Sequence, residues 1–114
     1  MKYDLEERTR KFSKEVIGFL MRMKKHRINE SMVSQLVRSA TSVGANYCEA
    51  NGASSRRDFR NKIFICRKEI QESAYWLEML AESNPEEKKN LRKLWQEAHE
   101  LTLIFNKIST SLKS

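Results

Sequence analysis

The chain has 114 residues, of which 39% are hydrophobic and 32% charged, and it holds only three glycines and one proline. That length suits one small domain with one core, and so little Gly and Pro excludes a turn-rich β-sandwich and a long low-complexity linker. The 22 Lys and Arg exceed the 15 Asp and Glu, and the net charge of +7 predicts an acidic partner such as nucleic acid or a membrane surface.

The N-terminus and the cysteines indicate the compartment. The first eight residues are too charged for a secretory signal peptide, and the longest apolar stretch, residues 17–21, is far shorter than the roughly 20 residues that span a bilayer. We therefore expect a soluble, cytoplasmic protein that does not contact a membrane. Cys48 and Cys66 lack a CxxC spacing and occupy apolar helix positions, so we expect buried free thiols rather than a disulfide or a metal site.

Residues 4–25 form the first predicted helix. It opens with Asp4-Leu5-Glu6-Glu7, a carboxylate variant of the capping box, and it ends in basic residues that complement the helix dipole. One face carries an apolar seam at helical spacing: Leu5, Thr9, Phe12, Val16, Phe19 and Met23.

Residues 31–50 form the second predicted helix. Arg38 and Glu49 are its only charged residues between positions 32 and 50, so neighbours should cover its sides more than those of an ordinary amphipathic helix. Gly44 in its interior costs about 1 kcal/mol relative to Ala, a cost that the close approach of a neighbouring backbone would offset. Its seam is Val33, Leu36, Ala40, Val43 and Tyr47.

Two further segments carry helix-start signals. Residues 55–83 begin with the capping-box pattern Ser55-Arg56-Arg57-Asp58, and residues 85–112 follow Asn84 as N-cap and Pro85 at the first position. The seam of the third helix is Phe59, Ile63, Cys66, Ile70, Ser73, Leu77 and Leu80. The seam of the fourth is Leu91, Leu94, Ala98, Leu101, Phe105, Ile108 and Leu112.

The seams advance by threes and fours that average about 3.5 residues, which predicts left-handed supercoiling, and short connections make neighbouring helices antiparallel. The fold class predicted is therefore all-α: an antiparallel up-down-up-down four-helix bundle in one domain, residues 1–114.

No catalytic or metal-binding motif accompanies these helices. His26 and His99 lie in charged surroundings, and the run from His99 begins like a zinc-protease helix but has Leu103 where the second histidine must stand. Glycine-rich phosphate loops and the paired Glu-x-x-His of a di-iron bundle are also missing from the sequence. We expect no enzymatic activity, no cofactor and no metal.

Basic residues concentrate in two places. Residues 1–30 hold nine positive and five negative side chains, a balance equally typical of a solvated helix face and of a nucleic-acid footprint. On the third helix, basic side chains alternate with Phe64 and Tyr75 on one flank, which favours subunit packing over base stacking. The candidate nucleic-acid contacts are Arg8, Arg10, Lys11, Lys14, Arg22, Lys24, Lys25, Arg27, Arg57, Arg60 and Lys68.

A polar stripe on the second helix is a candidate for assembly. It has one charge of each sign and small polar residues between them, and it is equally consistent with a solvated face and with a subunit interface or inter-helix network. Apolar residues outside the seam on both flanks of the third helix predict oligomer contacts. The candidate interface residues are Arg38, Ser42, Asn46, Glu49, Phe64, Ile65, Tyr75 and Trp76.

Residues 37–50, 55–59 and 68–77 carry a family resemblance. They contain the pattern Arg-Ser-x-x-Ser-x-x-x-Asn-x-x-Glu and a Tyr-Trp-Leu that follows Lys-Glu. Over nearly its whole length the chain resembles the small four-helix-bundle family of the 23S rRNA intervening-sequence protein. The resemblance implies a bacterial homopentamer with no catalytic residue.

A related branch, the accessory variability protein of diversity-generating retroelements, is a basic pentameric barrel that binds nucleic acid and its reverse transcriptase. The family's recurrent polar positions match Arg38, Ser42, Asn46, Glu49 and Glu72 here, so Glu72 joins the interface candidates. The chain departs from the family's pattern at three positions, namely Ala50, Lys68 and Glu69.

These observations predict a non-enzymatic homo-oligomer, a homopentamer by the resemblance, that binds structured RNA or DNA through basic surfaces. The alternative is a scaffold that docks a protein such as a reverse transcriptase or another nucleic-acid enzyme.

Overall fold

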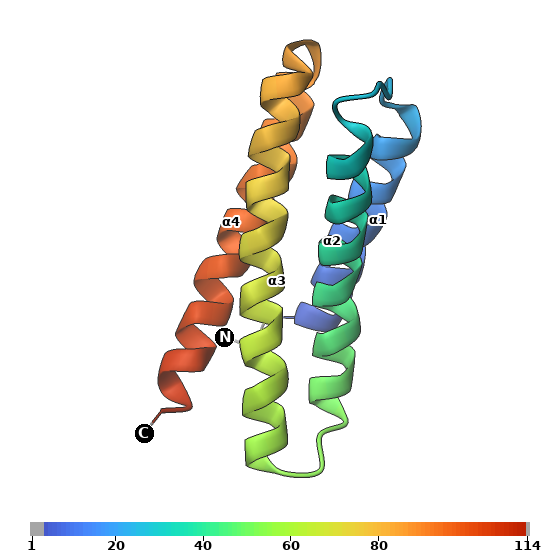
Figure 1. Ribbon diagram of the computed structural model, residues 1–114. Coiled ribbons are helices and arrows are strands. Elements are labelled where there is room, and N and C mark those ends of the chain that lie inside the picture. Colours follow the sequence, from blue (N-terminus) through green and yellow to red (C-terminus); the bar gives the residue numbers. More distant parts are fainter. Residues whose placement is uncertain (1–3, 114) are drawn as a thin grey trace.

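Four long helices make up the described part of the chain. The structure is a computed structural model that describes residues 4–113, and in that range it contains no strand. The helices run up, down, up and down in an elongated bundle of 45 × 22 × 20 Å (Figure 1), which confirms the predicted fold class. Their bounds are α1 Leu5–Arg22, α2 Glu30–Asn51, α3 Arg56–Ser83 and α4 Lys88–Ser111, with a 3-10 turn, η1, at Pro85–Glu87.

Two of the predicted helix starts are confirmed. The Asp4 carboxylate accepts a hydrogen bond from the backbone N–H of Glu7 at 3.2 Å, and the Ser55 hydroxyl accepts one from the N–H of Asp58 at 3.0 Å. Each side chain thereby satisfies a donor that the first turn leaves without a helical partner.

The first helix ends three residues earlier than predicted, at Arg22 rather than at residue 25. Met23 has extended backbone with ψ of 140°. The Lys25 ammonium donates to the carbonyls of Leu20 at 2.5 Å and Met23 at 3.1 Å, so a side chain satisfies acceptors that another helical turn would have used.

Asn84 is not the side-chain N-cap that the sequence predicted. Its Oδ1 accepts from Nδ2 of Asn29 at 2.9 Å and from the Ser83 hydroxyl at 3.0 Å, which leaves it no bond to the turn that follows. Pro85 does begin a helical turn, but that turn is 3-10, and α4 starts only at Lys88. The pairing between two loops therefore replaces the expected local cap.

The predicted seams form the core. Every seam residue of the first helix is buried, and the seams of the other three are buried or partly buried. Gly44 lies where α2 meets α1: a Cβ at this position would stand 3.6 Å from the carbonyl oxygen of Thr9, in ordinary van der Waals contact. The close approach predicted at Gly44 is thus present.

The two cysteines differ in exposure. Cys66 is buried and its thiol donates to the carbonyl of Val43 at 3.5 Å, as expected of a core thiol. Cys48 is exposed and faces the carboxylate of Glu6, so its predicted burial is wrong. The apolar stripe of α2 continues past Tyr47 to the buried Ala50, and Cys48 lies on the exposed side of that stripe.

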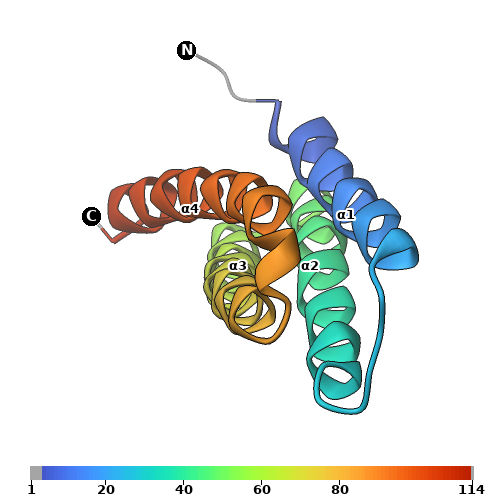
Figure 2. The same cartoon turned by 90° about the horizontal axis from the view of Figure 1, so that it is seen from above.

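The helices do not pack equally. The pairs that follow one another in the chain are in extended contact, whereas α1 and α4 touch over a short stretch only (Figure 2). The seam between α1 and α4 is consequently the open side of the bundle, and it positions the site described next.

Candidate nucleic-acid interface

Most of the basic side chains predicted on the first helix face solvent. Six of them are exposed and form no ion pair or hydrogen bond with any side chain of residues 4–113: Arg10, Lys11, Lys14, Arg22, Lys24 and Arg27. Because none of them is paired with a carboxylate, they present positive charge to the solution.

Arg8 and Lys25 make contacts within the chain instead. Nε of Arg8 lies 2.8 Å from Oε2 of Glu97, and its Nη2 lies 2.9 Å from Oε1 of Glu100. The hydrogen bonding that Arg8 donates to the Glu97 carboxylate is the main cause that raises the pKa of Arg8 above its ordinary value. Arg8 therefore links α1 to α4 through its ion pairs. Lys25 instead donates to carbonyls at the C-terminal end of α1.

A groove of about 540 Å³ follows the open seam between α1 and α4. Gly18, Phe19 and Leu94 supply its apolar lining, and the polar lining is mainly basic. Lys93 and Asn90 of α4 were not predicted as site residues. Part of the signal was available, because Lys93 precedes the seam residue Leu94 and the bundle topology sets α4 beside α1, but the distance between these helices was not. The full lining is Lys11, Lys14, Glu15, Gly18, Phe19, Arg22, Asn90, Lys93 and Leu94.

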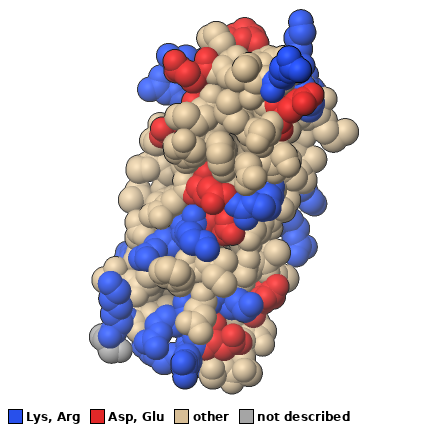
Figure 3. Space-filling model, viewed as in Figure 1, with Lys and Arg blue, Asp and Glu red and all other residues tan. Residues whose placement is uncertain are grey.

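The exposed face of α3 brings together the other predicted basic residues, Arg57, Arg60 and Lys68, all solvent-exposed. Figure 3 shows Lys and Arg gathered over the lower part of this face, where the N-terminal half of α3 lies. Two exposed aromatic side chains occur on the same helix, with Phe64 53% and Tyr75 52% exposed. We call Phe64 and Tyr75 the aromatic ridge of α3.

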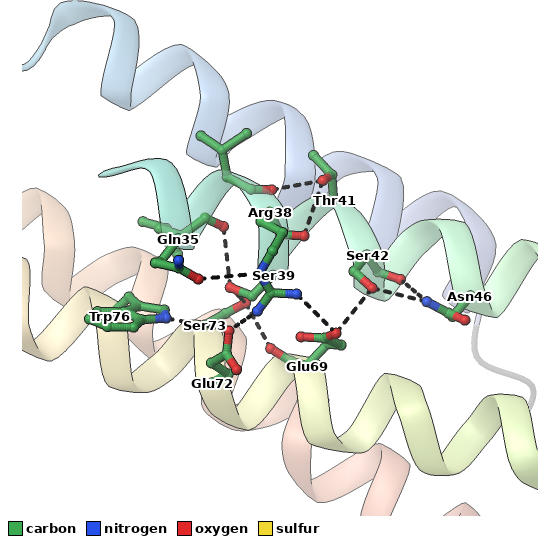
Figure 4. A network of polar contacts seen from close by, with 12 residues as sticks. Gln35, Arg38, Ser39, Thr41, Ser42, Asn46, Glu69, Glu72, Ser73 and Trp76 are labelled. Atoms are coloured by element: carbon green, nitrogen blue, oxygen red, sulfur yellow. Dashed lines mark hydrogen bonds and ion pairs between the residues drawn. The ribbon is translucent and has the colours of Figure 1, made fainter. Parts of the chain in front are cut away.

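The polar stripe of α2 forms a network with α3 (Figure 4). The Arg38 guanidinium pairs with Glu69 at 3.2 Å and with Glu72, and the Ser42 hydroxyl donates to the same Glu69 oxygen at 3.4 Å. Asn46 donates to Ser42 at 3.0 Å. Of the alternatives at this stripe, an inter-helix network is the one the chain forms by itself; a subunit contact there stays a prediction.

The remaining interface candidates surround this network. Glu49 pairs with Lys62 of α3 at 2.6 Å, an exposed pair that raises the pKa of Lys62. Trp76 is half-buried against the core and its Nε1 donates to Glu72 at 3.4 Å. Ile65 is also half-buried. Contacts of all these residues with a second subunit remain predictions.

Glu69 is a buried member of the α2–α3 network that the sequence analysis did not place there. It is 8% exposed, and although Arg38 and Ser42 bind its Oε2, its Oε1 is buried without a partner among the described residues. One sequence signal could have indicated its importance: Glu69, like the adjacent Lys68, departs from the residue type that the family has at this position.

Between residues 4 and 113, His, Cys, Asp and Glu side chains form no group of three or more that could hold a metal ion. In the same range no helix is both long enough and apolar enough to cross a membrane.

The comparisons with known proteins agree with this architecture. A solved structure from Bacteroides thetaiotaomicron VPI-5482, described as a protein with unknown function from the S23 ribosomal protein family, has 31% sequence identity and a TM-score of 0.80. The match covers 91% of this chain and 96% of that one. The comparison with curated proteins gave no match. Residues 1–113 match the family described as 23S rRNA-intervening sequence protein, and the chain therefore belongs to that family.

Proposed function

We propose that this chain is a non-enzymatic, cytoplasmic protein that assembles as a homopentamer and binds structured RNA or DNA through basic side chains of α1 and α3. The observation that carries the proposal is the set of unpaired basic side chains on α1 and the loop after it, of which Lys14, Arg22 and Arg27 are typical. Cations of this kind bind phosphates by releasing the counterions that surround a nucleic acid. The family name, which refers to 23S rRNA, is consistent with such a ligand.

Assembly would strengthen this field. Each chain carries a net charge of +7, so copies arranged around an axis add their positive charge on one surface. Binding of this type depends on phosphates more than on base edges, and the proposal therefore includes little sequence preference.

The test is a salt titration. Labelled RNA hairpins and DNA duplexes are titrated with the full chain at several salt concentrations, and anisotropy gives the Kd at each. We expect log K to fall with log salt at a slope of about −0.7 to −0.9 per phosphate contacted. The proposal is wrong if neither probe binds at low salt.

A matched control separates a defined surface from generic charge. The variant Arg57→Ala/Arg60→Ala loses two charges from the α3 face, and Lys107→Ala/Lys113→Ala loses two exposed charges from the C-terminal end of the chain. We expect the first pair to weaken binding more than the second. Equal losses from both pairs would contradict the assignment of α3.

A second candidate function is a scaffold that docks a nucleic-acid enzyme such as a reverse transcriptase. The observation that favours it is the aromatic ridge of α3, because exposed aromatic side chains are enriched at protein interfaces, and the Arg67 guanidinium lies 5.3 Å from the centre of the Phe64 ring. A reverse transcriptase encoded beside the gene would be purified and titrated against the chain. Binding that is kept at high salt, and that Phe64→Ala/Tyr75→Ala loses while light scattering shows the wild-type mass, would favour docking over nucleic-acid binding.

A further inference from the structure

We infer that the groove between α1 and α4 holds the sugar-phosphate backbone of a single-stranded nucleic acid. This inference rests on the proposed function and assigns the strand a defined place. The groove is concave, and four cationic side chains, Lys11, Lys14, Arg22 and Lys93, line it against one carboxylate, Glu15.

The cations of the groove have no competing partner. None of the four forms an ion pair or hydrogen bond with a side chain in the part of the chain that the structure describes. They also come from two different helices, so a ligand between them meets positive charge from both walls. An anion is the occupant that this arrangement attracts.

Gly18 gives the groove its depth. A Cβ at this position would meet only Nη1 of Arg22, at 3.7 Å, and no atom of α4. Gly in a helix interior costs about 1 kcal/mol relative to Ala, and whereas α1 would contact a Cβ at Gly44, no other helix would contact one at Gly18. The missing side chain instead leaves room above the apolar floor of Phe19 and Leu94.

The shape selects a single strand over a duplex. The whole bundle measures only 22 × 20 Å in cross section, so a double helix is too wide for a groove between two of its helices. From Lys11 to Arg22 the groove extends about 16 Å at 1.5 Å per residue, enough for about five phosphates of a stacked strand. No exposed aromatic residue lines it, so it contacts the backbone and not the base faces.

The end of the α1–α4 seam near Asp4 limits how far the strand can extend. There the lining becomes acidic, with Asp4, Glu7, Glu15 and Glu97 around Arg8 and Lys11. Glu97 neutralises Arg8 at 2.8 Å, and the remaining carboxylates repel phosphate. The bound strand therefore ends at Lys11 and does not extend toward Asp4.

The test fills the groove without changing its charge. Gly18→Leu puts a side chain over the floor, and Ser34→Leu makes a similar change at an exposed position of α2 that does not line the groove. Both are titrated with a labelled single-stranded oligouridine, and circular dichroism checks that they keep wild-type helicity. We expect Gly18→Leu to weaken binding about tenfold, since phosphates can no longer approach the cations, and Ser34→Leu to bind like the wild type.

Two further measurements do not depend on the fold of that variant. Lys14→Gln/Lys93→Gln should reduce the salt slope for oligouridine by about 1.4, the contribution of two phosphate contacts on a single strand. Lys107→Gln/Lys113→Gln removes the same amount of charge from outside the groove, and it should leave the salt slope for oligouridine close to that of the wild type. In the wild type, acetylation followed by mass spectrometry should show oligouridine protecting Lys14 and Lys93 but not Lys107.

The outcomes separate this inference from the proposed function. If the wild type binds hairpins and duplexes but not oligouridine, or if Lys14 and Lys93 stay unprotected while binding is salt-dependent, the groove is not the site and the proposed function stands. If no nucleic acid binds at low salt, the proposed function fails and the groove assignment fails with it.

Discussion

Asn29 and Asn84, 55 positions apart in the chain, share a buried hydrogen bond in which Nδ2 of Asn29 donates to Oδ1 of Asn84 at 2.9 Å. Oδ1 of Asn29 also accepts from the backbone N–H of His26 at 2.9 Å. Asn84→Ala removes one of the two acceptors of the buried Asn29 amide, whose Nδ2 also donates to the Lys24 carbonyl at 3.2 Å, and should lower the free energy of unfolding by about 1–3 kcal/mol. Urea unfolding measures this, and exposed Asn61→Ala is the control. Equal stability of the two variants would contradict a structural role for the pair.

Arg38→Ala should destabilise the chain because it removes the charge partner of Glu69, which is 8% exposed. We expect a loss of about 1–3 kcal/mol in the free energy of unfolding, moderated because Arg38 is itself half-exposed and solvent screens the pair. Arg57→Ala, which removes an arginine without a described partner, should change stability by less than about 0.5 kcal/mol. Unchanged stability with a smaller particle in light scattering would instead make Arg38 a subunit contact.

The aromatic ridge of α3 should control the oligomeric state. Phe64→Glu/Tyr75→Glu places charge on two half-exposed positions, so we expect wild-type helicity and dissociation to the 13.5 kDa monomer. Trp76→Glu should lower stability as well, because Trp76 packs on the core and binds Glu72. Light scattering and circular dichroism distinguish the two effects. A wild-type mass of one chain would refute assembly altogether.

Stability should fall at high pH through Cys66. Burial raises the pKa of its thiol from 9.0 to about 12. Below pH 9 the thiol is protonated in both folded and unfolded chains; between 9 and 12 only the unfolded chain releases the proton, so unfolding becomes more favourable as the pH rises. Burial also raises the pKa of Tyr47, which acts in the same direction. Cys66→Ala should therefore flatten, without abolishing, the decline of the free energy of unfolding across this range. An identical decline in both proteins would exclude Cys66.

The features that depend on residues close together in the sequence were predicted correctly. The seams follow from helical spacing, and the caps at Asp4 and Ser55 need partners only three residues away, so both were predictable. Asn84 was mispredicted because a partner 55 residues distant takes its side chain. Cys48 was mispredicted because spacing alone does not show where the rim of a buried stripe lies.

The candidate site divides in the same way. Exposed cations such as Lys14 and Arg22 follow from the polar face of an amphipathic helix, and their exposure was predictable. The pairing of Arg8 with Glu97 spans 89 positions, and the contribution of Lys93 depends on how far α4 stands from α1. That distance is set by side chains of both helices together, so no single segment encodes it.

The salt bridges of Arg8 also have a consequence for the kinetics of folding and unfolding. Among the described helices, α1 and α4 are the only contacting pair that are not consecutive, and the Arg8 side chain joins them. All other helix packing closes short loops, and such low contact order is typical of chains that fold in microseconds to milliseconds. The α1–α4 seam closes the longest loop, so we expect it to form after the transition state, and loss of Arg8 to accelerate unfolding while leaving the folding rate nearly unchanged.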